Sequence, residues 1–158
     1  MKFRVTQGDK VTPERQMTAK EFLRQYEYAA RRIVRLEEEL EEERILIDAV
    51  RSVSDNDGMP HGSGISKPTE EKAIRLADKL QRLADARVEA VRIRQEIFDV
   101  IEKVGGDEAD VLYQRYVKLK PDGSRQTWEE VCEAVYWSWF KVSGLHHSGL
   151  EKVEKLIK

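Results

Sequence analysis

The stretch "FLRQYEYAARRIVRLEEEL", residues 22–40, decides how this chain folds. Its apolar residues recur at alternating intervals of four and three, at Phe22, Tyr26, Ala29, Ile33, Leu36 and Leu40. This spacing places them along one stripe of an α-helix, because 3.6 residues complete each turn. Ile47 and Val50 continue the stripe beyond an interruption at Glu43. The pattern therefore predicts one amphipathic helix of about 35 residues.

The start of this helix is marked by Thr18, because Glu21 follows at the spacing of a capping box. Residues 1–16 lack helical periodicity and are predicted to form an N-terminal arm. The acidic run "EEELEEER", residues 37–44, is interpreted as the solvated face of the helix.

A second long helix is predicted after a loop at residues 53–69, which is rich in Ser, Asp, Gly and Pro. The loop residues 55–58 lack the ligand spacing of a calcium site, and His61 is interpreted as a bystander. We expect Thr69 to cap the second helix and the Gly105-Gly106 pair to end it. Its broad apolar stripe is interrupted by Arg87 and Arg94. Residues 17–104 should form an antiparallel hairpin whose stripes pack on each other or on a second chain, as in a dimer.

The composition excludes several kinds of protein. The net charge is −2, so overall charge does not favour nucleic acid or an anionic membrane. No apolar run is long enough to span a membrane. A lone cysteine, Cys132, indicates a reducing, cytoplasmic compartment and is expected to be buried and inert. Neither catalytic motifs nor zinc-ligand spacing occur, so we expect no enzyme, no metal and no cofactor.

The segment 105–158 has shorter apolar patterns than the hairpin and is predicted to be a separate domain of three short helices. These are expected at residues 107–118, at 127–135, and from Ser138 to near the end. Thr127 and Glu130 have capping-box spacing, and Ser138 can cap the last helix. Two helices joined by a turn of about three residues match a helix-turn-helix, although other helical corners look similar.

The stretch "TWEEVCEAVYWSWFKVSGLHHSGLEKV", residues 127–153, resembles region four of bacterial sigma factors. The positions that fall in register are Thr127, Glu129, Glu130, Val131, Ser138, Val142, Leu145 and Leu150. The preceding Leu112, Arg115 and Tyr116 are similar to the Leu-x-x-Arg-Tyr helix of that family. The resemblance implies an all-α, DNA-binding helix-turn-helix module.

The wider layout resembles phage late-transcription activators of the RinA and ArpU type, over roughly residues 20–157. In that family a loop similar to residues 58–77 precedes the second long helix, and a Leu-His pair like Leu145-His146 precedes the end. The resemblance implies a phage regulator of late or packaging genes that acts in the bacterial cytoplasm. It also implies double-stranded DNA as a partner, with bacterial RNA polymerase as a further candidate.

This chain departs from the family at the positions that read DNA. Sigma-type recognition helices place Arg and Glu directly after the serine cap, where this chain has Trp139, Phe140 and Lys141. The usual turn glycine is replaced by Tyr136, which would be strained at positive φ. Segment 107–158 carries six Lys and two Arg against three Asp and six Glu, a poor balance for binding phosphate. Gly144 and Gly149 should weaken the last helix.

The start of the last helix is the predicted DNA-reading edge, because recognition helices contact bases with their first turns. The residues expected to contact DNA are Arg125, Thr127, Ser138, Trp139, Phe140, Lys141, Ser143, Gly144, His147 and Lys152. The competing interpretation places the aromatics in the core or on a protein-docking face. We expect Trp137 in the core and Phe140 exposed, whereas the pattern leaves Trp139 open.

The sequence is compatible with three functions. The first is a DNA-binding transcriptional regulator that inserts its last helix into the major groove. The second is a small phage DNA-packaging subunit of the terminase type, which ring assembly would favour. The third is a helical interaction protein whose helix-turn-helix no longer binds DNA, which the scarcity of arginine favours.

Overall fold

The computed structural model describes residues 15–54 and 67–158, and within them the chain forms helices and no strands, so the predicted all-α fold is confirmed. The elements are α1 (Ala19–Ser54), α2 (Lys67–Val104), α3 (Gly106–Leu112), the π-helix η1 (Tyr113–Val117), α4 (Trp128–Val135) and α5 (Trp139–Ile157). Most of the predicted arm, His61 and the calcium-like cluster lie outside the described residues. In the described part, no helix combines the length and hydropathy that a bilayer crossing needs.

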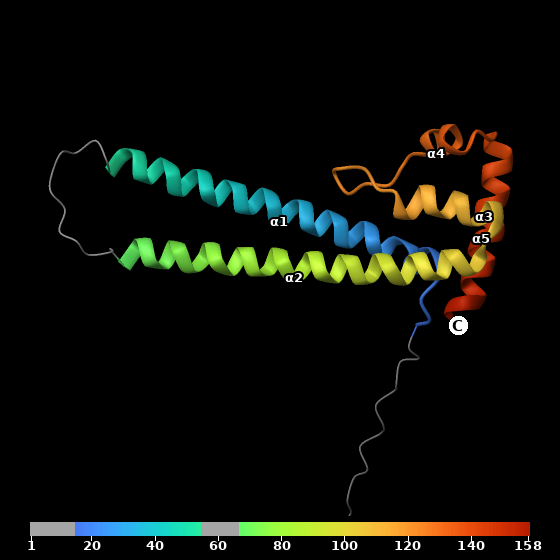
Figure 1. Cartoon of the computed structure of the whole chain (residues 1–158), viewed down its shortest axis with the longest axis horizontal. Helices are drawn as coiled ribbons and strands as arrows, with labels where there is room; N and C mark the ends of the chain where they lie inside the picture. The colour runs from blue at the N-terminus through green and yellow to red at the C-terminus, as the bar shows by residue number, and fades with distance from the viewer. Residues whose placement is uncertain (1–14, 55–66) are drawn as a thin grey trace, which may run out of the picture.

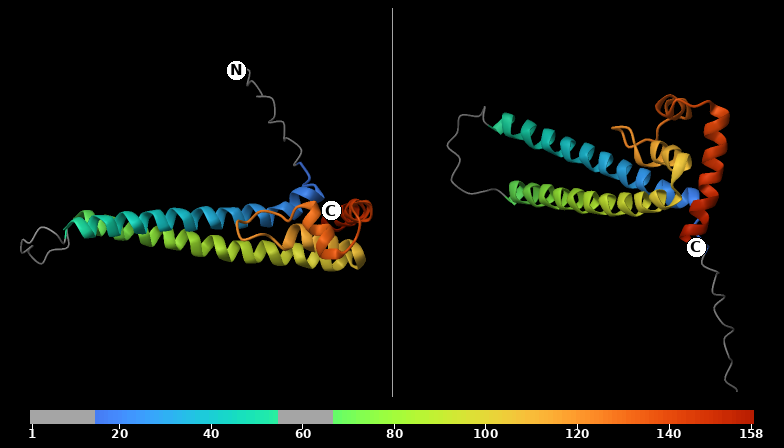
Figure 2. Two further views of the ribbon diagram at one scale, coloured as in Figure 1. Left: turned by 90° about the horizontal axis from the view of Figure 1, so that it is seen from above. Right: turned by 45° about the vertical axis from the view of Figure 1, so that its right-hand side comes forward.

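Helices α1 and α2 lie side by side as a long antiparallel hairpin (Figures 1 and 2). The predicted capping box begins α1: the Thr18 backbone N–H donates to Glu21 Oε2 at 2.9 Å, and the Glu21 N–H donates to Thr18 Oγ1 at 3.3 Å. The expectation that Thr69 caps α2 was wrong, because α2 begins at Lys67. Pro68 is compatible with this earlier start, since proline suits the first turn of a helix.

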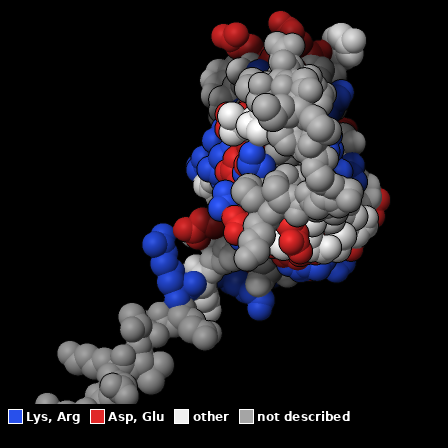
Figure 3. All heavy atoms as spheres, turned by 90° about the vertical axis from the view of Figure 1, so that its left-hand side faces the viewer, with Lys and Arg blue, Asp and Glu red and all other residues white. Residues whose placement is uncertain are grey.

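Only part of the predicted stripe of α2 packs on α1. Leu40 of α1 and Leu83 of α2 are buried, together with Ala86 and Ala90, which the predicted stripe did not include. Glu43, which interrupts the stripe of α1, lies 3.1 Å from Lys79 Nζ, so an ion pair fills the gap. Lysine, arginine and acidic side chains are intermixed on the face seen from the loop end (Figure 3).

A second apolar stripe on α2 remains exposed. Leu80, Val88 and Val91 are 42%, 72% and 69% exposed, and Ala77 and Ala84 are also exposed. Ala77, Leu80, Ala84 and Val91 fall in one heptad register, whereas Val88 lies one residue beyond the heptad position that Arg87 occupies. The broad apolar pattern predicted for α2 thus consists of two stripes, of which α1 covers one.

The chain leaves the hairpin at Gly105 and Gly106, whose φ angles are 65° and 64°. Such positive φ values favour glycine, because glycine has no Cβ to clash with the backbone. The helix predicted over residues 107–118 is observed as α3 followed by η1. The widened turn ends at Lys118, whose N–H donates to Tyr113 O at 3.0 Å.

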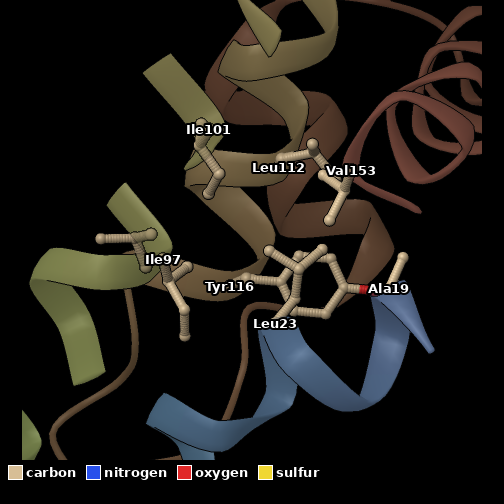
Figure 4. Packing of buried hydrophobic residues seen from close by; sticks show 8 residues of the cluster. Ala19, Leu23, Ile97, Ile101, Leu112, Tyr116 and Val153 are labelled. Carbon is tan, nitrogen blue, oxygen red and sulfur yellow. The ribbon is translucent and has the colours of Figure 1, made fainter. Parts of the chain in front are cut away.

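One hydrophobic core joins the base of the hairpin to the C-terminal segment. α5 crosses the end of the hairpin where α1 begins and α2 ends (Figures 1 and 2). The fully buried residues of this cluster include Leu23, Ile97, Leu112, Tyr116 and Val153 (Figure 4). The core therefore crosses the boundary drawn at Gly105-Gly106.

A smaller cluster holds α4 against the first half of α5. Val111, Val131 and Val142 are fully buried, and Trp137 and Cys132 pack against them while remaining partly exposed. Trp137 and Cys132 thus both lie half-buried at the edge of this core, so Trp137 packs on the core as expected without being enclosed by it, and the expectation of a buried Cys132 is wrong. Consequently α5 belongs to both clusters, with its first half in this one and its second half in the shared core.

The two glycines of α5 are expected to respond oppositely to alanine. A Cβ at Gly149 would lie 3.1 Å from Leu112 Cδ1 and 3.3 Å from Glu108 Cβ, so overpacking should outweigh the gain in helix propensity and Gly149→Ala should lower the free energy of unfolding by about 0.5 kcal/mol. A Cβ at Gly144 would have nothing within 4 Å, so Gly144→Ala should raise it by about 0.5–1 kcal/mol. Urea denaturation of both variants measures the pair. Equal changes of the same sign would contradict the packing of α3 against α5.

Candidate nucleic-acid interface

Helices α4 and α5 form a helix-turn-helix with both predicted caps. Thr127 Oγ1 accepts from the Glu130 N–H at 3.2 Å, and Glu130 Oε2 accepts from the Thr127 N–H at 2.6 Å. Ser138 Oγ accepts from the Lys141 N–H at 3.4 Å. Between the helices, Tyr136 adopts φ 58° and ψ 35°, the left-handed conformation that the sequence led us to expect.

The first turn of α5 faces outward. Phe140 is 91% exposed and Trp139 is 54% exposed. Tyr136, in the preceding turn, is 93% exposed. The expectation for Phe140 is confirmed, and the question left open for Trp139 is answered in favour of the surface. Three exposed aromatic side chains thus surround the start of the helix.

Lys141 extends from this edge but does not stand alone. Its Nζ lies 3.8 Å from the centroid of the Trp137 ring and 3.8 Å from Asp107 Oδ2. The ring attracts the ammonium group by its quadrupole, and the carboxylate offsets part of its charge. Lys141 is therefore accessible, with a weaker outward field than an unpaired lysine would have.

The other candidate residues of α5 divide between two sides of the helix. Gly144 and His147 are exposed, and Ser143 is half-buried. His147 Nε2 lies 3.4 Å from Glu151 Oε1, so an acidic group borders this end of the face. Lys152 instead turns toward α3, where its Nζ lies 2.8 Å from Glu108 Oε1. The structure thus separates Lys152 from the proposed reading edge.

Arg125 is also placed differently from the prediction. Its Nε lies 2.7 Å from Oε2 of Glu27, a buried residue of α1, and its side chain is 20% exposed. The sequence could not show this pairing, because Glu27 and Arg125 are far apart in the chain. In this structure Arg125 anchors the loop before α4 to the hairpin. Thr127, two residues later, is exposed at the start of α4.

An aromatic cluster packs against Trp139 of the candidate interface. The ring of Trp128 lies 5.4 Å from that of Trp139 and 4.7 Å from that of His146. The Arg115 guanidinium lies 4.3 Å from the centroid of Trp128. His146 Nε2 is 2.9 Å from the Tyr116 hydroxyl, which ties α5 to η1. Burial first, and nearby cations such as Lys20 second, lower the pKa of His146 to about 4.

This lowered pKa predicts a pH dependence of stability. Between pH 6.5 and about 4 the unfolded chain protonates His146 whereas the folded chain does not, so stability should fall as the pH falls. The slope is limited to about 1.4 kcal/mol per pH unit and is smaller because the ring is partly exposed. Urea denaturation across this window should show a shallower slope for His146→Phe than for the wild type. Identical slopes for the wild type and His146→Phe would contradict the assignment.

Comparison with known proteins gives no match: no protein-family model, curated protein or solved structure is similar to this chain. Within the described ranges, no group of three or more His, Cys, Asp or Glu side chains is placed to hold a metal ion.

Proposed function

We propose that this protein binds double-stranded DNA through the start of α5 and regulates transcription, in the manner of the phage activators that its sequence resembles. The observation that carries the proposal is the outward-facing first turn of α5. Trp139 and Phe140 are exposed there, and Ser138 caps the helix. A recognition helix needs such a free, convex N-terminal edge to enter the major groove.

The chemistry of this edge favours apolar contacts with bases. Phe140 and Trp139 offer faces and edges suited to thymine methyl groups, and Lys141 can contact a guanine edge or a phosphate. The bidentate arginine contacts that dominate guanine recognition are missing from this turn. We therefore propose preference for sites that contain thymine, and contact with RNA polymerase as a second role of the exposed aromatics.

The proposal predicts that two substitutions on this edge weaken DNA binding. Phe140→Ala removes an exposed ring, and Lys141→Glu reverses a charge facing the duplex. Each is expected to lower affinity by about tenfold, since a good base contact contributes about 1–3 kcal/mol. The ligand is the set of fragments of the parent genome that the wild type retains, and binding is measured by fluorescence anisotropy.

The matched control is Lys155→Glu, which makes the same charge change near the other end of α5, where Lys155 is exposed. This variant should bind like the wild type at equal salt. If Lys141→Glu and Lys155→Glu lose affinity equally, the groove assignment is wrong. If the wild type retains no fragment, DNA binding itself is wrong.

The hairpin provides a surface for a homodimer. Most of the exposed stripe of α2 falls in one heptad register, which suits packing on a second helix of the same sequence. Arg87 occupies one position of this register, and Val88 lies one residue beyond it. The members of the stripe are Ala73, Ala77, Leu80, Ala84, Val88 and Val91. Pairing two hairpins along this stripe would form a four-helix arrangement and present two α5 helices to one DNA.

Light scattering should give the mass of two chains for the wild type. The double variant Val88→Glu with Val91→Glu should give the mass of one chain, and a wild-type monomer would refute the dimer.

The same measurement bears on the alternatives. A ring of many chains would favour the small DNA-packaging subunit. A stable dimer that retains no DNA would favour the helical interaction protein. The excess of acidic over basic residues in segment 107–158 is the observation behind that second alternative.

A further inference from the structure

Four arginines from three parts of the chain lie close together, and three of them pair with one buried carboxylate. Glu27 of α1 is 2% exposed, and its oxygens lie 2.9 Å from Arg31, 2.7 Å from Arg125 and 3.7 Å from Arg24. Arg115 of η1 adjoins this group, since its guanidinium donates to the backbone carbonyl of Gln126, the residue after Arg125. Burial first, and repulsion from Arg125 second, lower the pKa of Arg115. We call Arg24, Arg31, Arg115 and Arg125 the arginine cluster.

Gly123 allows the loop before α4 to approach the backbone of α1 closely. A Cβ there would lie 2.9 Å from the backbone nitrogen of Arg31, so only glycine allows this approach, and its φ of 81° requires glycine as well. The approach brings Arg125 within reach of Glu27. The cluster is therefore a product of the tertiary fold.

The charges in the arginine cluster do not balance. One carboxylate, Glu27, pairs with three guanidinium groups, that of Arg115 lies beside them, and Asp122 lies at the edge, near Arg31. Arg24 and Arg31 keep 40% and 51% of their side chains exposed, so their excess charge reaches solvent. Such a concentration of half-exposed guanidinium groups attracts phosphate, which they can bind in a bidentate manner.

The arginine cluster adjoins the candidate interface. Arg115 packs on Trp128, whose ring in turn contacts that of Trp139 at the start of α5. Lys20 of α1 and His147 of α5 also line one surface hollow, together with Glu151 and Glu154. The basic residues of α1 thus lie beside the module whose own surface carries an excess of acidic residues.

We propose that Arg24 and Arg31 of α1 contact the phosphate backbone of the DNA whose major groove receives α5. The inference rests on the proposed function and deepens it: the helix-turn-helix reads the bases, and the hairpin supplies cations that the module lacks. Arg125 stays paired with Glu27 and positions the cluster, whereas the half-exposed guanidinium groups of Arg24 and Arg31 turn toward the duplex.

The test is the salt dependence of binding to a labelled duplex of mixed sequence, between about 50 and about 200 mM salt. Each phosphate contact contributes about −0.9 to the slope of log affinity against log salt. The double variant Arg24→Gln with Arg31→Gln should therefore reduce the slope by about 1–2 and lower affinity on the order of 10- to 100-fold at about 100 mM salt. Arg24→Lys with Arg31→Lys keeps both charges and should retain the wild-type slope.

The matched control is Arg32→Gln with Arg44→Gln, which removes two exposed arginines from other positions on α1. It should leave the slope within about 0.5 of the wild type. Equal slopes for the wild type and Arg24→Gln with Arg31→Gln would overturn this inference while leaving the role of α5 intact. A wild type that fails to bind the duplex at low salt would overturn both. Circular dichroism checks that each variant remains folded, and the lysine variant separates charge from packing.

Discussion

Tyr116→Ala is expected to lower the free energy of unfolding by about 3–5 kcal/mol, as removal of a large buried ring does. Tyr116 is 2% exposed and lies in the core shared by α1, α2, η1 and α5 (Figure 4). Because this core spans the Gly105-Gly106 boundary, the hairpin base and the C-terminal segment should unfold together. Urea denaturation followed by far-ultraviolet circular dichroism and by tryptophan fluorescence should give coincident transitions.

The control for this prediction is Tyr116→Phe, which keeps the ring and removes only the hydroxyl bonded to His146. It should lower stability by about 1 kcal/mol, the usual contribution of one hydrogen bond. Two separate transitions, with the tryptophans reporting the earlier one, would show that the C-terminal segment folds independently and would contradict the shared core.

Glu27→Ala is expected to lower the free energy of unfolding by about 3 kcal/mol, the lower end of the range for breaking a buried ion pair. The carboxylate holds Arg31 at 2.9 Å and Arg125 at 2.7 Å, and its removal would leave guanidinium groups facing one another. The lower end applies because Arg24 and Arg31 are partly solvated. Chemical denaturation measures the loss.

Glu39→Ala is the matched control, since Glu39 is an exposed acid on the same helix. Its effect should stay within about 0.5 kcal/mol. If the two variants differ by less than about 1 kcal/mol, Glu27 is not the centre of a buried network. A Glu27→Ala protein that binds DNA more tightly at low salt would also fit the excess charge of the arginine cluster.

The helices and their caps could be predicted because their signals are local. The four-and-three spacing of Phe22 to Leu40 fixes the face of α1, and Thr18, Thr127 and Ser138 mark helix starts through bonds to residues three positions away. Even the left-handed turn at Tyr136 followed from the register of the resemblance. The start of α2 was missed because Pro68 allows a helix to begin before Thr69.

The partners of the charged residues could not be predicted, because they depend on which distant elements meet. Arg125 and Lys152 looked available in the sequence, yet they pair with Glu27 and Glu108. The basic residues of α1 carried a weak signal, since Lys20, Arg24 and Arg31 recur at helical spacing. This spacing alone indicates only a solvated helix face, because the sequence does not show that the C-terminal segment lies beside it.

Tyr136 adopts a backbone conformation that is unfavourable for a residue with a side chain. A left-handed conformation at a residue other than glycine costs on the order of 1 kcal/mol, and a side chain exposed at 93% recovers little of that by packing. Glycine would make the same turn without strain. The ring at this corner therefore contributes little to the stability of the isolated protein, and Tyr136→Gly would keep the turn while removing the ring.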